Sequence, residues 1–531
     1  MTQQTKLILL VSVFLVLTGN FTFFSKTLEF FPLDSITNIL FMVTLVINFI
    51  LFVNIILLIL SSKYTMKPLI ISLLSVSSSV AYFTNSYNVV IDHNMIQNMF
   101  ETSVKESMDL LTFKMILYFL FLGVLPSIIV LKTDISYDTF KNEVFSKLKS
   151  ALFSLGVIVV TVLMFSSHYT SFFRGHKELR SYANPTFYMY SFQKYIKRTY
   201  FKTIPTLKLI ADDATIVEED MQKDRELIIM VVGEAARADR FSLNGYEKDT
   251  NPLLKQENIF NFEQMYSCGT ATAVSVPCMF SVYGRNDYED QKARYTENAI
   301  DILRKSGVNI LWRDNNSDSK GVALRVEYQD YQSPKLNTMC EGECRDEGML
   351  VGLQEYIDSH KQGDILIVLH QMGNHGPAYY KRYPKEFEKF TPVCKDSQLE
   401  NCTKEEISNA YDNAILYTDY FLSKVIDLLK KNDDFETAMV YMSDHGESLG
   451  ENNIYLHGLP YMIAPQTQKH IPSVFWFGSR ISEELDMDKF KGKLKDEFNH
   501  DYLFHTLLGL FEVETKEYKK ELDILSNIRK E

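Results

Sequence analysis

The chain has 531 residues, of which 46% are hydrophobic and 23% are charged, and its formal net charge is −12. Single hydrophobic cores stop growing at about 250–300 residues, so this length predicts at least two domains. The acidic balance, with no basic tail or stripe in the sequence, argues against a nucleic-acid-binding protein.

Apolar runs fill the first third of the sequence. Five of them are long enough, or nearly so, to cross a bilayer, which takes about 20 helical residues. They cover residues 7–24, 39–60, 69–83, 115–131 and 151–165. The third run contains four serines between residues 75 and 79, so a re-entrant or interfacial segment is the alternative there. We predict a domain of five transmembrane helices over residues 1–170.

Lysine placement predicts the orientation of this domain, because short loops rich in Lys and Arg stay in the cytoplasm. Seven lysines fall on one side of the predicted spans: Lys6, Lys63, Lys67, Lys132, Lys141, Lys147 and Lys149. We therefore expect a cytoplasmic N-terminus. An odd number of spans then places everything after about residue 170 on the opposite face of the membrane.

Residues 171–211 mix aromatic side chains with Arg and Lys and form a predicted bridging segment. Aromatic rings at headgroup depth and cations facing lipid phosphates would hold such a segment at a membrane surface. A linker helix that packs on the following domain is the alternative, and composition does not decide between the two.

From residue 212, short apolar runs alternate with helix-like stretches. The predicted strands cover residues 227–232, 308–312, 365–370, 438–442 and 474–477, and the clearest predicted helix covers 404–432. This alternation predicts a mostly parallel sheet between two layers of helices. We expect a three-layer α/β/α sandwich over residues 212–531, with ligands bound at the carboxyl ends of its strands.

All the cysteines of the chain lie in this second part, which suits an oxidising compartment. Their order along the sequence favours three disulfides between neighbours: Cys268 with Cys278, Cys340 with Cys344, and Cys394 with Cys402. The alternative is a zinc–thiolate site, although the Cys340–Cys344 spacing is loose for one.

Side chains that can bind a metal follow three of the predicted strands. They are Glu234 after the first, His370 at the end of the third, and Asp444 and His445 after the fourth, with His375 and His457 shortly downstream. Carboxylates and imidazoles together suit zinc or a similar divalent ion. Each residue alone has a simpler explanation as a helix cap or a loop side chain, so the joint placement carries the metal hypothesis.

The segment between Cys268 and Cys278 is rich in hydroxyl groups. A hydroxyl bound to a divalent cation loses its proton easily and becomes a nucleophile at neutral pH. Four residues are candidates for this role, and residue type does not choose among them: Ser267, Thr270, Thr272 and Ser275.

Five sequence segments, in order, resemble those of the phosphoethanolamine transferases of the bacterial inner membrane, a family that includes the mobile colistin resistance enzymes. They are VVGEAARADRFSLNGY, SCGTATAVSVPCMFS, WRDNNSDSKGV, HQMGNHGP and SDHGESLGENNIYLHG. The resemblance covers essentially the whole chain. It implies five transmembrane helices and a periplasmic catalytic domain with the fold of the alkaline phosphatase and sulfatase superfamily.

The resemblance also implies roles for individual residues. Thr272 matches the nucleophile, and Glu234, Asp444 and His445 match zinc ligands that the Thr272 oxygen completes. His375 and His457 match a second metal or phosphate subsite, and the substrate-pocket positions are Asn316, Lys320, Glu447 and His370. A Cys268–Cys278 disulfide, which the family also has, would hold Thr272 within reach of the metal.

The function that this resemblance implies is transfer of phosphoethanolamine from phosphatidylethanolamine to a phosphate of lipid A. A covalent phosphothreonine would form on the way, zinc would be the cofactor, and the product would confer polymyxin resistance. We expect a monomer with its active site at the bilayer surface, because the donor and the acceptor are both lipids.

Several alternatives stay open. The acceptor could be a core sugar, a glucan or a surface protein, and the donor could be a glycerolphosphate lipid, as in lipoteichoic acid synthesis. A sulfatase would need a Cys/Ser-x-Pro-x-Arg motif, whereas Cys278 begins CMFSVYGR. A catalytically silent lipid-headgroup sensor would ordinarily have lost a ligand or the nucleophile, and all of these are present.

Overall fold

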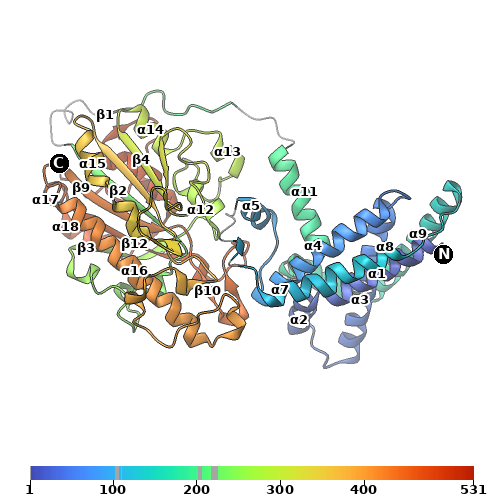
Figure 1. The fold of residues 1–531 in the computed structure, drawn as a ribbon. Coiled ribbons are helices and arrows are strands. Elements are labelled where there is room, and N and C mark those ends of the chain that lie inside the picture. Colours follow the sequence, from blue (N-terminus) through green and yellow to red (C-terminus); the bar gives the residue numbers. More distant parts are fainter. Residues whose placement is uncertain (1, 102–106, 109, 201–205, 217–224, 531) are drawn as a thin grey trace. The chain divides into compact units, whose positions relative to one another are not determined.

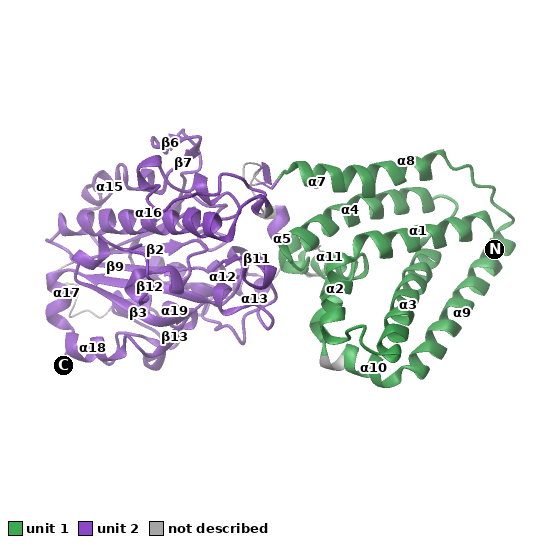
Figure 2. Cartoon of the chain, turned by 90° about the horizontal axis from the view of Figure 1, so that it is seen from below, with its two compact units in different colours: residues 1–96, 111–201 green, residues 97–110, 202–531 purple. Residues whose placement is uncertain are grey.

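A computed structural model describes residues 2–101, 107–108, 110–200, 206–216 and 225–530. The chain forms two compact units, which Figure 2 shows in different colours. Unit 1 comprises Met1–Ile96 and Leu111–Phe201, and unit 2 comprises Gln97–Leu110 and Lys202–Glu531. The domain limits expected at residues 170 and 211 stay predictions, and residues 201–205 of the predicted bridging segment lie outside the described residues.

Unit 1 consists of apolar helices. Its longer elements are α1 (Gln3–Gly19), α2 (Phe21–Phe30), α3 (Ile36–Leu60), α4 (Met66–Tyr87), α7 (Phe113–Tyr118), η1 (Phe119–Val124), α8 (Leu125–Lys132) and α9 (Phe140–Met164). Within the described residues, four spans are long and apolar enough to cross a membrane, or five if the bent pair α1 and α2 is one span. The serine-rich third run lies in α4, which is one of those four.

The first predicted span is broken, which hydropathy did not predict. Helices α1 and α2 meet at Asn20 with a bend of 65°. The buried Asn20 amide donates to Val16 O (3.1 Å) and to Asn184 O (2.7 Å), and its Oδ1 accepts from Asn184 N (2.8 Å). A side chain that takes over backbone hydrogen bonds in this way is a recognised cause of helix kinks.

The predicted bridging segment is mainly helical. After α10 (Ser166–Thr170) it contains η2 (Ser171–Gly175), η3 (Lys177–Tyr182) and α11 (Thr186–Tyr200). Leu179, Tyr182 and Tyr188 are buried, and the Tyr188 hydroxyl lies 3.1 Å from Ser77 Oγ of α4. The first part of α11 therefore packs on the helices of unit 1.

Unit 2 is built on an eight-stranded sheet (Figure 1). In spatial order the strands are β13 (Glu497–Asn499), β3 (Ile259–Tyr266), β12 (His470–Phe477), β9 (Glu436–Ser443), β2 (Glu226–Gly233), β8 (Ile365–His370), β4 (Asn309–Asp314) and β5 (Glu327–Asp330). Only β12 runs antiparallel to its neighbours in this sheet, so the predicted mostly parallel sheet is confirmed. The sequence did not predict β3, β5 or β13, because β3 is only half buried and the two edge strands are short.

Helices cover both faces of the sheet (Figure 2). One face packs against α12 (Thr272–Met279), α14 (Ala299–Lys305) and α19 (Leu503–Leu510), and the other against α15 (Leu353–Ser359) and α16 (Lys404–Lys430). Successive residues of β2 alternate between the two cores, with Ile228 and Met230 on one side and Leu227 and Ile229 on the other. The predicted three-layer α/β/α sandwich is confirmed.

Helix α16 corresponds to the helix predicted over 404–432. A capping box fixes its start, because Thr403 Oγ1 accepts from Glu406 N (3.2 Å) and a Glu406 carboxylate oxygen accepts from Thr403 N (2.7 Å). Its buried stripe, which includes Ile407, Ile415 and Phe421, faces the sheet. The helix thus shields the central strands whose carboxyl ends carry the candidate site.

Candidate metal centre

The candidate site lies at the carboxyl edge of the sheet. Strands β9, β2 and β8 are parallel neighbours, and their register pairs Gly233 with Ser443 and Val232 with His370. Glu234 follows β2 directly and Asp444 follows β9 directly, so the two carboxylates leave the sheet side by side. Both side chains are buried.

Glu234, Asp444 and His445 converge on one point. The His445 Nε2 atom lies 3.5 Å from Glu234 Oε1 and 3.4 Å from Asp444 Oδ2, and one ligand atom from each residue lies within 4.8 Å of the others. Hydrogen bonding of His445 Nδ1 to Gly446 O (2.8 Å) leaves Nε2 with its lone pair toward the carboxylates. The fully buried Glu234 Oε1 and Asp444 Oδ2 have no hydrogen-bond partner among the described residues.

The electrostatics of this trio favour a bound cation. Burial and the charge of Glu234 raise the pKa of Asp444 well above its usual value. Burial also opposes ionisation of Glu234, but the surrounding imidazoles, His445 first, outweigh it and lower its pKa to about 2. Burial lowers the pKa of His445 to about 3. Two buried carboxylates and a neutral imidazole are mutually compatible when a divalent cation lies between them.

Thr272, the first residue of α12, joins this group. Its Oγ1 donates to Glu234 Oε2 (3.0 Å) and lies 3.3 Å from His445 Nε2. The other candidate hydroxyls bond to backbone: Ser267 Oγ to Gly269 O, Thr270 Oγ1 to Leu459 O, and Ser275 Oγ to Gly269 N. Within the described part of the chain, Thr272 is the one of the four whose hydroxyl contacts the carboxylate–imidazole group.

A disulfide closes the loop that presents Thr272. Cys268 and Cys278 are joined, as are Cys340 with Cys344 and Cys394 with Cys402. Every cysteine of the chain is therefore part of a disulfide, so no thiolate is left for the alternative zinc site. Gly458 N donates to Thr270 O (2.7 Å), so this loop also contacts the loop that carries His457.

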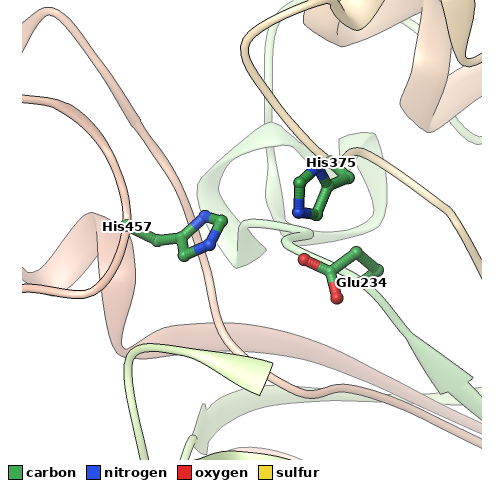
Figure 3. A group of neighbouring side chains, drawn as sticks. All are labelled: Glu234, His375 and His457. Carbon is green, nitrogen blue, oxygen red and sulfur yellow. The ribbon is translucent and has the colours of Figure 1, made fainter. Parts of the chain in front are cut away.

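A second group of ligands shares Glu234. Figure 3 shows Glu234, His375 and His457 with their polar atoms pointing toward one another, and one atom from each lies within 4.8 Å of the others. The His457 Nδ1 atom lies 3.0 Å from Glu447 Oε2, and the His457 and His445 rings are 4.3 Å apart. The two groups therefore form one continuous cluster around Glu234.

The three other residues expected in the substrate pocket have different surroundings. Asn316 Nδ2 donates to Glu234 Oε2 (2.9 Å), which places it inside the cluster. The buried Lys320 ammonium folds back onto Ser317, donating to its backbone O (2.7 Å) and its Oγ (2.8 Å). His370 is fully buried, and its Nδ1 lies 2.9 Å from Asp314 Oδ2.

Sequence reasoning missed Asp314, which organises this side of the site. Its carboxylate accepts from His370 Nδ1, from Trp312 Nε1 (2.8 Å), and from the backbone N of Asn316 (2.9 Å) and Asp318 (3.2 Å). Asp314 is the last residue of β4, whereas the predicted strand stopped at residue 312. The strand-end rule that selected Glu234 would have selected Asp314 with the correct boundary.

Asp346 and His500 also hold loops of the site in place, and no sequence pattern predicted either role. The buried Asp346 carboxylate accepts from Met372 N (2.8 Å) and Gly373 N (3.1 Å), and so shapes the turn before His375. At Gly373, φ is +48° and an added Cβ would lie 2.8 Å from Glu234 O, so this turn requires glycine. His500 bridges Cys268 N (3.0 Å) and Ser443 O (3.0 Å).

A buried carboxylate–imidazole centre therefore lies at the carboxyl edge of this α/β/α sandwich. The family model for sulfatases matches residues 226–513, which include Glu234, Thr272, Asp444 and His445. A model described as phosphoethanolamine transferase EptA/EptB matches residues 49–200. These matches define the class: a sulfatase-like enzyme with membrane helices.

Full-length relatives then identify the family. The chain is 43% identical over 515 residues to phosphatidylethanolamine transferase Mcr-2 from Escherichia coli, covering 95% of this chain and 94% of the relative. It is 40% identical over 535 residues to phosphoethanolamine transferase EptA from Escherichia coli strain K12, covering 98% and 96%. The chain belongs to the phosphoethanolamine transferases, and it is an enzyme of that class.

Solved structures agree with this assignment. The integral membrane lipooligosaccharide phosphoethanolamine transferase A (EptA) from Neisseria meningitidis matches with a TM-score of 0.96 at 35% identity, covering 99% of both chains. The C-terminal periplasmic domain of phosphoethanolamine transferase EptC from Campylobacter jejuni matches with a TM-score of 0.54 at 45% identity, covering 60% of this chain and 97% of that one.

Proposed function

We propose that this enzyme transfers phosphoethanolamine from phosphatidylethanolamine to a phosphate of lipid A, with Thr272 as the nucleophile and zinc as the cofactor. The observation that carries the proposal is the Thr272 hydroxyl beside the unpartnered oxygens of Glu234 and Asp444 and the Nε2 atom of His445. The activities for which the relatives are named support phosphatidylethanolamine as the donor and an acceptor of the lipooligosaccharide type.

Zinc suits this donor set, because carboxylate oxygens and imidazole nitrogens are its ordinary ligands. Glu234, Asp444 and His445 would hold it together with the Thr272 oxygen. When bound, zinc would favour loss of the Thr272 proton at neutral pH. This fit rests on Glu234 Oε1 and Asp444 Oδ2, which are buried and have no hydrogen-bond partner among the described residues.

Two in-line displacements complete the transfer. Thr272 Oγ1 first attacks the phosphorus of the donor; the new O–P bond forms as the bond to the diacylglycerol oxygen breaks, and that oxygen takes up a proton. The proton that Thr272 loses balances the proton that the diacylglycerol oxygen gains. An oxygen of the acceptor phosphate then attacks the same phosphorus, and the Thr272 oxygen leaves and regains a proton.

Other residues of the cluster act on the phosphoryl group. His375 and His457 face the space beside Glu234, where N–H donors stabilise charge on the phosphoryl oxygens as it develops. Glu447 orients the His457 ring through its contact with Nδ1. Asn316 holds the Glu234 carboxylate in place.

The proposed location follows from the lipid substrates. The helices of unit 1 would lie in the bacterial inner membrane with the N-terminus in the cytoplasm, and unit 2 would lie in the periplasm as a monomer. Each transfer adds an ammonium group to an anionic lipid. The modified surface then attracts cationic polymyxins less strongly, which is the origin of the proposed polymyxin resistance.

Mass spectrometry of lipid A from cells that produce the chain tests the proposal. Lipid A should gain one phosphoethanolamine group with the native chain and none with Thr272→Ala, and polymyxin tolerance should follow the same pattern. A modified core sugar together with unmodified lipid A would contradict the assignment of lipid A as the acceptor. Consumption of labelled phosphatidylglycerol in place of phosphatidylethanolamine would overturn the donor.

A further inference from the structure

Unit 1 contains a cavity of about 620 Å³ that the catalytic proposal does not use. Its wall combines apolar helices of unit 1 with the bridging segment, and it includes Asn48, Phe52, Val162, Phe173, Arg180 and Tyr190. A volume in this range is typical of small-molecule sites rather than of packing defects. All of these residues belong to unit 1.

The interior of the cavity is apolar because its polar wall residues bond to protein atoms. Asn48 Nδ2 donates to the Tyr169 hydroxyl (2.7 Å), Asn48 Oδ1 accepts from Thr161 Oγ1 (2.9 Å), and Thr186 Oγ1 donates to Ala183 O (3.1 Å). The remaining surface consists mainly of aromatic and aliphatic side chains. A hydrocarbon chain meets these requirements, whereas a polar ligand would lose its hydrogen bonds with water without replacement.

Part of the cavity wall is exposed at the surface of unit 1. Phe52, Phe173 and Tyr190 of its wall are 50%, 52% and 59% exposed, so the opening is bordered by exposed aromatic side chains. Arg180, the single charged residue among the lining residues, is also exposed. Its guanidinium has the geometry to pair with a phosphate group. An apolar interior with a cation at the surface matches an acyl chain that is linked to a phosphodiester.

We infer that this cavity holds one acyl chain of the donor lipid, phosphatidylethanolamine, with the lipid phosphate beside Arg180. This inference rests on the proposed function, which makes that lipid the donor. The cavity would keep a donor molecule bound to the enzyme between reaction cycles, so its occupancy would govern the KM for the donor and leave the chemistry at Thr272 unchanged.

Two matched substitutions on α9 test the inference. Val162→Trp places an indole in the cavity, whereas Val160→Trp puts the same ring on the neighbouring 56% exposed position outside it. In the full chain purified in detergent, Val162→Trp should lose most of the co-purified phosphatidylethanolamine and Val160→Trp should retain it. Loss of burial for only two methylene groups costs about tenfold in affinity, so the KM for the donor should rise at least about tenfold in Val162→Trp with kcat unchanged.

Arg180→Gln, compared with Lys177→Gln at an exposed position of η3 outside the lining, tests the phosphate contact by the same two measurements. Native-like lipid retention and KM in both Val162→Trp and Arg180→Gln would overturn the inference. Equal retention of phosphatidylglycerol and phosphatidylethanolamine by the native chain would overturn the assignment to the donor. A native chain that retains the lipid but transfers nothing would instead contradict the proposed function.

Discussion

The two units of this enzyme differ in how much apolar surface they leave exposed. In α9, only 6% of the most apolar window is buried, and large side chains such as Phe145 and Phe153 are exposed. In β2, every residue from Leu227 to Val232 is fully buried, and the polar residues collect where the strand ends. Helix α9 is therefore suited to face lipid, and buried hydroxyls of unit 1 such as those of Ser12 and Thr27 donate to backbone carbonyls of their own helices.

This difference places the chemistry of a lipid-modifying enzyme in unit 2 and the binding of lipid in unit 1. Unsatisfied buried oxygens cluster at the carboxyl edge of the sheet, at Glu234, Asp444 and Glu447. Such groups are costly unless they bind something, so they mark the chemistry. The apolar cavity of unit 1 has no comparable group and serves binding alone. Damage to the sheet edge should stop the reaction, whereas damage to the cavity should weaken only the use of donor.

The largest expected effect comes from Thr272. Replacement by alanine should lower kcat by about a thousandfold or more, because it removes the nucleophile on which the covalent step depends. Thr270→Ala is the matched control, since the Thr270 hydroxyl donates to Leu459 O, and it should reduce activity at most severalfold. Steady-state transfer with labelled donor measures both. Substantial activity in Thr272→Ala would show that the chemistry does not depend on this residue at the sheet edge of unit 2.

A smaller loss of activity is expected from Asp314→Asn. The amide nitrogen cannot accept hydrogen bonds, so Asp314→Asn loses either the bonds that hold the loop with Asn316 or those from Trp312 and His370. Substitutions of such supporting residues typically cost about 10–100-fold in activity or metal affinity. Zinc affinity should fall together with kcat, while the KM for the donor stays native. Asp358→Asn, at an exposed position of α15, is the control and should change neither quantity.

Loss of the Cys268–Cys278 disulfide should affect both stability and kcat. Closing a loop of this length contributes roughly 2–3 kcal/mol to the free energy of unfolding. The double serine variant should unfold more readily by about that amount and place Thr272 less accurately. Calorimetry of the full chain in detergent measures the first effect and transfer kinetics the second. A destabilised variant with native kcat would show that the disulfide plays no part in positioning.

The smallest effect concerns pH. Burial lowers the pKa of His500 to about 3, below the unfolded value of about 6.5. Protons therefore bind more strongly to the unfolded chain, and stability falls as the pH drops from about 6.5 toward 3. Between pH 7.5 and 5.5 the loss should be roughly 1 kcal/mol. Unfolding of His500→Gln should depend less on pH over this range, and an unchanged dependence would contradict the assignment.

Features that depend on the local sequence could be predicted. Hydropathy located the helices of unit 1, and short apolar runs that predict buried strands located Glu234, His370 and Asp444 at one edge of the sheet. Features set by distant contacts were not predictable. The bend at Asn20 depends on hydrogen bonds to Asn184, and the roles of Asp346 and His500 depend on loops that meet only in the folded chain. Asp314 was missed through a two-residue error in a strand boundary.

Peptide mapping of the intermediate tests the central claim most directly. The full chain, incubated with phosphatidylethanolamine without acceptor and quenched in acid, should carry one phosphoethanolamine group on the peptide that contains Thr272, and the adduct should disappear when acceptor is added. An adduct on another residue, or an active enzyme that never forms one, would contradict the account.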